Sequence, residues 1–365
     1  MARKKRTEGT VNQQELANRL KISRTTVSRC FTNHPAINPE TRSRVFQLAA
    51  SLGYVHLEMR NPERRPVRNG WTFGVLVCTD LEHYFHGRYE SPGEKLMEGV
   101  AEFAQLENIR LDVRHVPPSV RSLQDPVYRA LPLARKRRWS GVLLIYPFPD
   151  EVVRGLARLL PVVSLVEHAG LADIDCVDVD HHKGIAAAYA RLVAAGHRRV
   201  GFFTLPYARE AGWSLRRYGA FLEVLAQAGC RPDPRDLVNV PPEILPSQAQ
   251  SYDRVAARIR DGVTGWICAA DHMAFDLADA LAARHIVVPR QASLTGFDGL
   301  KIPARAPQLS TVLVPYREIG LIGAKRLAEI ASKRFSAAQH ILVQPGFRAG
   351  ETVGPTAGSS RRRGG

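Results

Sequence analysis

The stretch "KISRTTVSRCF", residues 21–31, decides how the N-terminal part of the chain is interpreted. It has the composition of a short helix carrying Arg24, Arg29 and several hydroxyl groups, but no acidic residue. A solvated helix face normally mixes charges of both signs. A face made of cations and small hydrogen-bonding groups instead indicates a polyanionic partner.

A helix signal precedes this stretch and another follows it. Asn12 can cap the first helix, with Glu15 placed to bond back to it, and Ser23 can cap the second. Asn38 and Pro39 open a third, since proline in the first turn loses no hydrogen bond. Apolar residues at helical spacing form the expected core: Leu16, Ala17, Leu20, Val27, Phe31, Val45, Leu48, Ala49 and Leu52. Three short helices with a tight turn between the first two predict a helix-turn-helix module.

The second helix then presents its polar side outward. Arg24 and Thr25 at its start can reach base edges, where arginine pairs bidentately with guanine. Helix starts also hold phosphates through hydroxyl and backbone N–H groups. The predicted DNA-binding residues are Asn12, Ser23, Arg24, Thr25, Thr26, Ser28 and Arg29. The alternative is a solvated basic face on which Ser23 is a plain cap.

The charge distribution favours the DNA interpretation. The formal net charge is +16, and residues 1–70 hold 14 Lys/Arg against 5 Asp/Glu. The basic excess is therefore concentrated in the small N-terminal module, as expected for a protein that binds nucleic acid.

Cysteine usage and hydropathy indicate a soluble cytoplasmic protein. The five cysteines are widely spaced and never form C-x-x-C, so we expect small buried thiols rather than disulfides or a zinc site. The basic start lacks the apolar stretch of a signal peptide, and no run reaches the ~18 apolar residues of a membrane span.

From Trp71 onward, apolar strand candidates alternate with helical stretches. This alternation predicts parallel sheets in doubly wound α/β lobes, and its length favours two lobes over one. The strand candidates are 72–78, 109–116, 141–147, 162–167, 176–180, 200–206, 265–270, 292–298 and 310–315.

The N-terminal segment resembles the headpiece of the lactose-repressor (LacI/GalR) family. The similarity rests on "LANRLKISRTTVSR" and on "TRSRVFQLAASLGY", in the family's spacing. Lys21 stands where many members have glycine at the turn. A positive φ at a lysine costs about 1–2 kcal/mol, so the turn is strained but allowed.

The segment after the headpiece departs from the family pattern. Members usually carry Ala-Arg-x-x-Leu, a hinge helix that wedges its leucine into the DNA minor groove, whereas this chain reads "GYVHLEMRNPERRPVRNGW". Pro62 and Pro66 disfavour a helix across them. A flexible basic linker is favoured, with Leu57 or Met59 as the alternative apolar wedge.

The core resembles the same family more weakly, through "VDVDHHKGIAAAYARLVAAGHRRVGFF", "SLRRYGAF", "AADHMAFDLADAL" and "SLTGFDG". This resemblance implies two lobes like those of periplasmic sugar-binding proteins, joined by three crossings around a ligand. Arg217 matches an arginine that binds ligand hydroxyls, with Arg216 as the alternative if the register shifts by one. The residues expected to bind effector are Asp80, Phe85, Trp213, Arg217, Asp271 and Asp298.

Two family positions do not match. The ligand aspartate after the "PV" strand is Val166 here, followed by Glu167, and the residue before Asp271 is Ala270. Either the effector is not a standard hexose, or the polar contacts come from elsewhere, with Trp213 and the segment "HGRYESPG" (86–93) as candidates. A faint resemblance to xylose-responsive regulators makes a pentose the leading candidate.

Enzyme function is not expected. The densest group of metal-ligand types, "DVDHH" (178–182), would place adjacent histidines on opposite faces of a strand, so no metal site is predicted. No Walker, G-x-G-x-x-G, G-x-S-x-G or H-E-x-x-H motif occurs, and no cofactor is expected.

The sequence therefore predicts a homodimeric regulator, more often a repressor in this family, that binds operator DNA under control of a sugar effector. The alternative is a cytoplasmic sugar-binding or metal-dependent sugar-processing protein with an accessory DNA-binding module. The predicted divisions are a headpiece (10–56), a basic linker (57–70), an effector-binding and dimerisation core (71–352) and a disordered basic tail (353–365).

Overall fold

The computed structural model describes most of the core and part of the headpiece. The described residues are 13–31, 37–38, 41–42, 44–45, 48–49, 70–79, 90–133, 139–167, 173–205, 212–301, 306–332 and 337–356. Residues 57–69 of the predicted linker and the end of the basic tail lie outside these ranges.

The headpiece has the predicted helix-turn-helix start. Helices α1 (Gln13–Leu20) and α2 (Arg24–Phe31) are joined by a turn in which Lys21 adopts φ +53°. The lysine therefore takes the left-handed conformation for which glycine is favoured, at the cost anticipated above. Helical conformation recurs within 41–49. The buried core contains Leu16, Ala17, Val27, Cys30, Val45 and Ala49. The side chain of Phe31 and the position of Leu52 lie outside the described residues.

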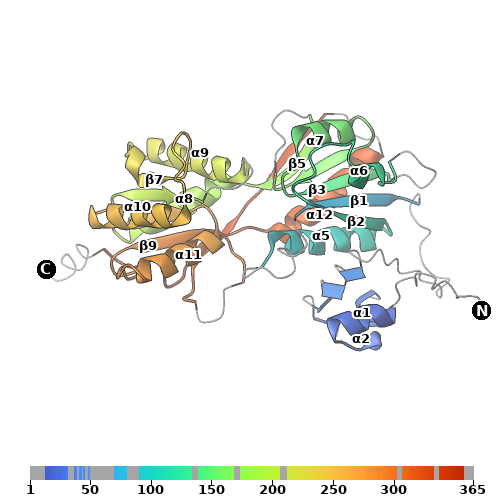
Figure 1. Cartoon of the computed structure of the whole chain (residues 1–365), viewed down its shortest axis with the longest axis horizontal. Helices are drawn as coiled ribbons and strands as arrows, with labels where there is room; N and C mark the ends of the chain where they lie inside the picture. The colour runs from blue at the N-terminus through green and yellow to red at the C-terminus, as the bar shows by residue number, and fades with distance from the viewer. Residues whose placement is uncertain are drawn as a thin grey trace, which may run out of the picture.

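The core consists of two lobes, each built on a six-stranded sheet (Figure 1). The first lobe has the strand order β11-β5-β4-β3-β1-β2 and every pairing is parallel. Its elements are β1 (Thr72–Cys78), α5 (Pro92–Leu106), β2 (Arg110–Val116), α6 (Pro126–Arg129), β3 (Gly141–Ile145), α7 (Asp150–Ala157), β4 (Val162–Leu165), β5 (Asp175–Val179), α12 (Tyr316–Ala331) and β11 (His340–Val343).

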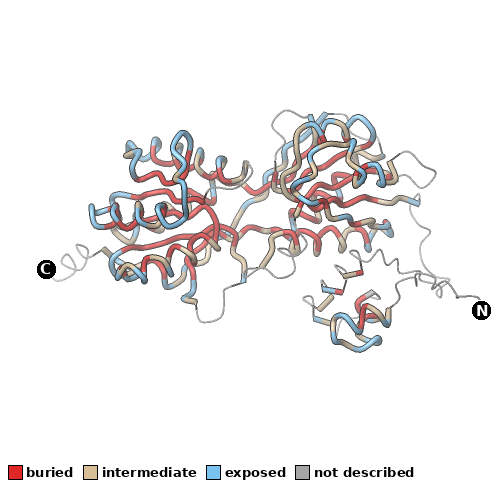
Figure 2. Tube along the Cα trace, viewed as in Figure 1, coloured by how far each residue is buried: buried red, intermediate tan, exposed pale blue. Residues whose placement is uncertain are grey.

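The second lobe has the order β12-β10-β9-β8-β6-β7, in which only the β10–β12 pair is antiparallel. Its elements are α8 (His181–Ala194), β6 (Val200–Phe203), α9 (Gly212–Gln227), η1 (Pro234–Asp236), β7 (Leu237–Val238), α10 (Gln248–Arg260), β8 (Gly265–Cys268), α11 (Asp271–Ala282), β9 (Ser293–Asp298), β10 (Ser310–Leu313) and β12 (Gly346–Arg348). The inner strands of both lobes are buried between covering helices, whereas β2, β11 and β12 at the sheet edges are partly exposed (Figure 2). The doubly wound α/β fold predicted from the alternation is confirmed.

Three crossings join the lobes, as the resemblance implied. The chain passes into the second lobe between β5 and α8, returns between β10 and α12, and crosses again between β11 and β12. Because the strands of each lobe are mainly parallel, their carboxyl ends gather near these crossings. Functional side chains are therefore expected where the lobes face one another.

Some predicted details were wrong. β7, β11 and β12 were not anticipated, because they are short and β11 and β12 alternate exposed and half-buried positions without a continuous apolar run. Ordered structure also continues past the predicted core end at residue 352: Val353 is buried, and the Thr356 N–H donates to the Ala195 carbonyl at 3.1 Å. Of the five cysteines expected to be buried, Cys230 is exposed.

Close helix packing in the first lobe depends on two glycines. α5 packs along α12, and a Cβ atom at Gly320 would overlap the carbonyl oxygen of Leu96, while one at Gly99 would overlap that of Arg317. Neither neighbour can move easily, because both atoms belong to helix backbone. The two helices therefore approach as closely as they do only because both positions lack a side chain.

We expect Gly320→Ala to lower the free energy of unfolding by about 1–3 kcal/mol, since it forces α5 and α12 apart. Gly219→Ala is the matched control: Gly219 lies inside α9 with open space around its Cβ position. Gly219→Ala should raise the free energy of unfolding by about 0.5–1 kcal/mol, because alanine has the higher helix propensity. Urea unfolding of both variants measures these free energies. Equal changes in the two variants would contradict the close packing of α5 against α12.

Candidate functional site

The first candidate site is the outward face of α2. Ser23, Arg24, Thr25 and Arg29 are exposed, and Thr26 and Ser28 are half-buried. The Ser23 side chain caps the helix by accepting a hydrogen bond from the Thr26 N–H at 3.0 Å, as predicted. No acidic residue lies in the first turn of α2. The face thus offers guanidinium, hydroxyl and helix-start N–H donors with no nearby carboxylate on the same helix.

Three predicted site residues lie outside the described part of the chain, namely Asn12, Asp80 and Phe85, as does the first half of the "HGRYESPG" segment, residues 86–89. The remaining predicted effector residues are Trp213, Arg217, Asp271 and Asp298. The structure brings the first two together with Asp298, and it places Asp271 behind them.

The second candidate site lies between the lobes, centred on Arg217. Its guanidinium is buried, donates from Nη2 to Asp298 Oδ1 at 3.0 Å, and donates from Nη1 to the Ala269 carbonyl. It is also sandwiched between the rings of Phe297, 3.8 Å from the centroid, and Trp213, 4.6 Å from the centroid. Such stacking suits the flat, weakly hydrated guanidinium and fixes its orientation.

Asp298 connects this cluster to the first lobe. Its Oδ1 accepts a second hydrogen bond, 2.7 Å long, from the hydroxyl of Tyr316, the first residue of α12. Asp298 itself ends β9 with φ +144°, a backbone conformation that favours glycine. The carboxylate is therefore held in place by one donor from each lobe. Its Oδ2 accepts no hydrogen bond from the described residues.

Arg216 makes a separate set of contacts across the lobes. Its Nη2 donates to the Val166 carbonyl at 3.1 Å, its Nε lies 3.3 Å from Asp178 Oδ2, and its Nη1 lies 3.5 Å from Glu167 Oε1. All three partners belong to the first lobe, whereas Arg216 belongs to α9 of the second. The two adjacent arginines thus serve different lobes, so neither replaces the other.

Glu167 is the least satisfied carboxylate of this group. Burial raises its pKa to about 7, and nearby Asp178 adds to the rise, although Arg216 and a backbone hydrogen bond from Trp213 oppose it. Only 9% of the residue is exposed. Its Oε2 atom is buried and has no hydrogen-bond partner among the described residues.

Asp178 behaves in the opposite way although it is fully buried. Burial alone would raise the pKa of its carboxyl group, but a hydrogen bond from His181, the charge of Arg216 and the Val179 N–H outweigh burial and lower the pKa to about 2. Asp178 Oδ2 lies 3.1 Å from His181 Nε2. Asp178 is therefore the fixed negative charge of the interlobe site.

His181 has a defined tautomer in this network. Arg217 Nε lies 3.4 Å from His181 Nδ1, and an arginine can only donate. Nδ1 is thus the acceptor, and Nε2 carries the proton that points to Asp178. Burial lowers the pKa of His181, which acts in the same direction as this geometry.

Asp271 supports the site from within the second lobe. Its Oδ2 accepts from the Gly299 and Leu300 N–H groups at 2.8 and 3.1 Å, and its Oδ1 accepts from the Thr311 hydroxyl. Burial, with the nearby charge of Asp298, raises its pKa to about 7. Its described contacts hold the turn after Asp298, and none of them crosses to the first lobe.

One placement in the sequence interpretation was wrong. His181 and His182 begin helix α8 and do not lie in a strand, since Asp180 caps that helix by accepting from the Lys183 N–H. The described residues contain no group of three or more His, Cys, Asp or Glu side chains arranged to hold a metal ion. None of the described helices is long and apolar enough to cross a bilayer.

The sequence interpretation also missed several residues of the interlobe site: Asp178 and His181 as a hydrogen-bonded pair, Phe297, and Tyr316. The dense "DVDHH" cluster and the "GFD" motif were the available signals for the first three. Tyr316 gave none, because its role depends on where the second crossing places the start of α12.

The chain has clear relatives among known proteins. Residues 13–56 match the family described as bacterial regulatory proteins, lacI family, and residues 189–353 match a periplasmic binding protein-like domain. The HTH-type transcriptional regulator Rv3575c of Mycobacterium tuberculosis is 28% identical, over 82% of this chain and 85% of that protein.

Three solved structures share the fold. The match to the transcriptional regulator CelR–cellobiose complex covers 94% of this chain and 99% of that chain, with 21% identity and a TM-score of 0.64. The match to the lac repressor dimer bound to operator and the anti-inducer ONPF covers 95% of this chain and 100% of that chain, with 18% identity and a TM-score of 0.61. A regulator from Enterococcus faecium with bound ribose covers 78% and 99%, with 20% identity and a TM-score of 0.58.

Proposed function

Because the chain belongs to the LacI family of bacterial regulatory proteins, we propose that it binds operator DNA as a homodimer and that a sugar held between its lobes controls this binding. The chain is a transcriptional regulator and not an enzyme. Its site of action is then the cytoplasm, where the operator is. The proposed units are the headpiece (10–56), linker (57–70) and core, which we extend from residue 352 to 356.

The observation that carries the effector proposal is a pair of carboxylate oxygens, one in each lobe, that accept no hydrogen bond from the described residues. They are Glu167 Oε2 in the first lobe and Asp298 Oδ2 in the second. Sugar hydroxyls are the donors that such oxygens require, and the Trp213 ring offers a plane for a sugar C–H face. We assign direct effector contacts to Trp213, Arg217 and Asp298, together with Asp80 and Phe85.

A pentose is the proposed effector. Glu167 has a longer side chain than the aspartate expected one residue earlier, and its Oε1 lies 3.5 Å from Arg216 Nη1 of the other lobe. We expect the longer side chain to favour a smaller sugar ring. The related regulator with bound ribose agrees with this size class.

Effector binding would act on DNA through the angle between lobes. Arg216, Tyr316 and Glu90 each bond across the lobes, the last by accepting from the Lys301 N–H at 2.9 Å. A ligand that competes for these groups shifts the relative position of the lobes and hence the spacing of two headpieces on half-sites one DNA turn apart. Coupling of ~1–3 kcal/mol between ligand and operator is expected, with repression in the unliganded state.

Selection of bound DNA from a random pool by the full-length protein tests the proposal. We expect a near-palindromic motif, which then serves as the probe for screening ribose, xylose, arabinose and hexoses by release of protein. Recovery of no motif at near-physiological salt would contradict sequence-specific binding. Recovery of a motif without response to any sugar would contradict only the effector assignment.

Arg24→Ala should weaken binding by about 1–3 kcal/mol at one base pair of each half-site and relax the preference there, because Arg24 is assigned to a base edge. Arg29→Ala, which removes the same charge from the same helix, should weaken binding to all sequences alike and lower the salt dependence. Competition binding with single-base operator variants separates the two. Uniform losses for both variants would show that Arg24 contacts only the backbone.

A further inference from the structure

A pocket of about 580 Å³ lies in the second lobe, away from the interlobe site. Residues at or just after the C-terminal ends of α8, α10 and α11 line this pocket. Pro355 and Thr356, at the end of the described chain, complete its wall. Thr264 in its wall precedes β8, whereas Ala269, which accepts a hydrogen bond from Arg217, follows β8. The pocket therefore opens at the amino ends of the strands, with the length of the sheet between it and the effector site.

The wall of this pocket is cationic. It contains Arg260, Arg284, Arg290, His197 and His285, and it contains no aspartate or glutamate. Arg284 is neutralised, since its Nε donates to Asp253 Oδ1 at 2.8 Å. Arg260 and Arg290 are exposed and form no ion pair within the described chain. Arg260 also faces the C-terminus of its own helix, where a cation is favourable, but Arg290 lies in a turn and has no such role.

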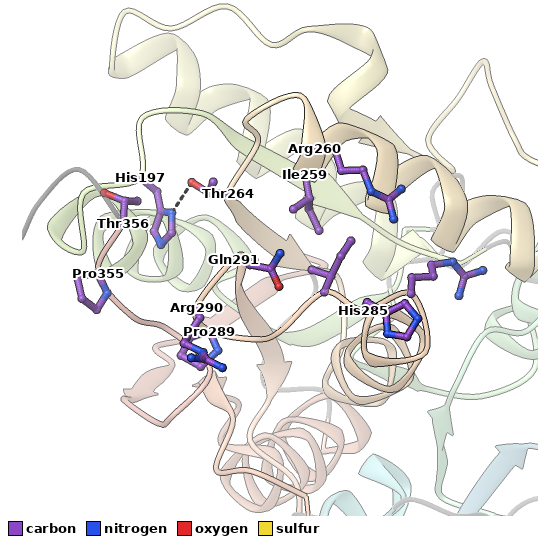
Figure 3. Close-up of a pocket in the computed structure, with 12 residues that line it drawn as sticks. His197, Ile259, Arg260, Thr264, His285, Pro289, Arg290, Gln291, Pro355 and Thr356 are labelled. Carbon is purple, nitrogen blue, oxygen red and sulfur yellow. Dashed lines mark hydrogen bonds between the residues drawn. The ribbon is translucent and has the colours of Figure 1, made fainter.

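The remaining polar groups lie on an apolar floor, and Gln291 offers free donors among them. The Gln291 Oε1 atom accepts from the Val287 N–H at 2.8 Å, so its amide N–H groups are the free part of the side chain. His197 Nδ1 is fixed against the Thr264 hydroxyl at 2.8 Å. In Figure 3, Arg260 and His285 lie on one side of the pocket and His197 and Thr356 on the other, with Gln291 between them. Ile259, Ile286, Pro289 and Pro355 supply the apolar surface.

We propose that this pocket is a second ligand site, which binds a small metabolite carrying at least two anionic groups, phosphate or carboxylate. Two guanidinium groups that form no ion pair within the described chain can pair with two anionic groups, and planar forks suit both phosphate and carboxylate oxygens. The volume is that of an ordinary metabolite site. The apolar floor accommodates the carbon skeleton between the charged ends. A neutral sugar would leave both guanidinium groups unpaired, so the two sites select different chemistry.

The test is calorimetric titration of the full-length protein at 150 mM salt with pyrophosphate, with citrate and with sorbitol as the neutral probe. We expect binding of at least one of the two anions and none of sorbitol. The double variant Arg260→Gln/Arg290→Gln should bind that anion at least tenfold more weakly. Arg260→Lys/Arg290→Lys keeps the charge but loses the planar guanidinium. Its affinity for that anion should lie between the affinities of the unmodified protein and of the glutamine double variant. Whether pyrophosphate or citrate binds more tightly identifies the anion class.

The matched control is Arg158→Gln/Arg231→Gln, which removes the same charge from two exposed arginines without ion pairs in the described chain and outside the pocket. Its affinity should stay within twofold of the unmodified protein. Equal losses in both double variants would mean that the anion responds only to net charge, and this would overturn the proposal. Absence of binding by both anions would overturn it as well.

Discussion

Arg217→Met should lower the free energy of unfolding of the full-length protein by about 3–5 kcal/mol, because it leaves the carboxylate of Asp298 buried without its cationic partner. Methionine keeps apolar contact with Phe297 and Trp213, so the loss measures the charge pair more than the packing. Urea unfolding at one fixed protein concentration gives the value, since any assembly of the chain makes stability depend on concentration.

Two further variants make this result specific. Arg217→Met combined with Asp298→Asn removes both charges, and Tyr316 can still donate to the asparagine carbonyl, so the double change should cost less than Arg217→Met alone. Arg284→Met breaks an ion pair whose aspartate, Asp253, is 66% exposed, so it should cost no more than about 1 kcal/mol. If Arg217→Met cost no more than Arg284→Met, the pair with Asp298 would not be the buried contact described.

Part of the fold and part of the interlobe site could be predicted from the sequence. The pattern predicted the fold class and the two lobes, because strands and helices are encoded by local apolar periodicity, whereas the three crossings were implied only by the family resemblance. The pattern also predicted the cap at Ser23, since a cap is set by neighbouring residues, while the strained turn at Lys21 was expected from the comparison with the family pattern. The same reasoning found Arg217 and Asp298 only through the family resemblance.

The interlobe network could not be predicted in the same way. Arg216 and Arg217 were treated as alternatives for one role, whereas successive residues on a helix point about 100° apart and here reach different lobes. Tyr316 and Glu90 contact partners that are distant in sequence, so their roles depend on how the crossings orient the lobes. Strands β11 and β12 were missed for the same reason: each is defined by pairing with a distant strand, not by its own composition.

The surroundings of Glu167 make the stability of the protein depend on pH. Glu167 faces Asp178, Arg216, the Trp213 backbone and the thiol of Cys176, and burial is the main cause that raises its pKa from 4.5 to about 7. Between pH 4.5 and 7 the unfolded chain releases a proton that the folded chain keeps. The free energy of unfolding therefore falls as pH rises through this window and levels off above it.

Glu167→Gln should flatten this decline and raise the free energy of unfolding at pH 8, by up to roughly 3 kcal/mol relative to the unmodified protein. Below pH 4.5 the two proteins should be nearly equal, because both then carry a neutral group at this position. Urea unfolding at pH values from 4.5 to 8 measures the difference. Asp271, whose pKa is raised in the same direction, keeps part of the slope in the variant.

Glu151→Gln is the control for this titration, because Glu151 is an exposed carboxyl group at the start of α7 in the same lobe. It should change the free energy of unfolding at pH 8 by no more than about 1 kcal/mol. A Glu167→Gln protein that is less stable than the original at pH 8 would mean that the ion pair with Arg216 outweighs the cost of burying the charge. Glu167 would then lock the two lobes together above pH 7. If the variant is instead more stable, an effector hydroxyl that donates to Oε2 gains by relieving the same buried charge.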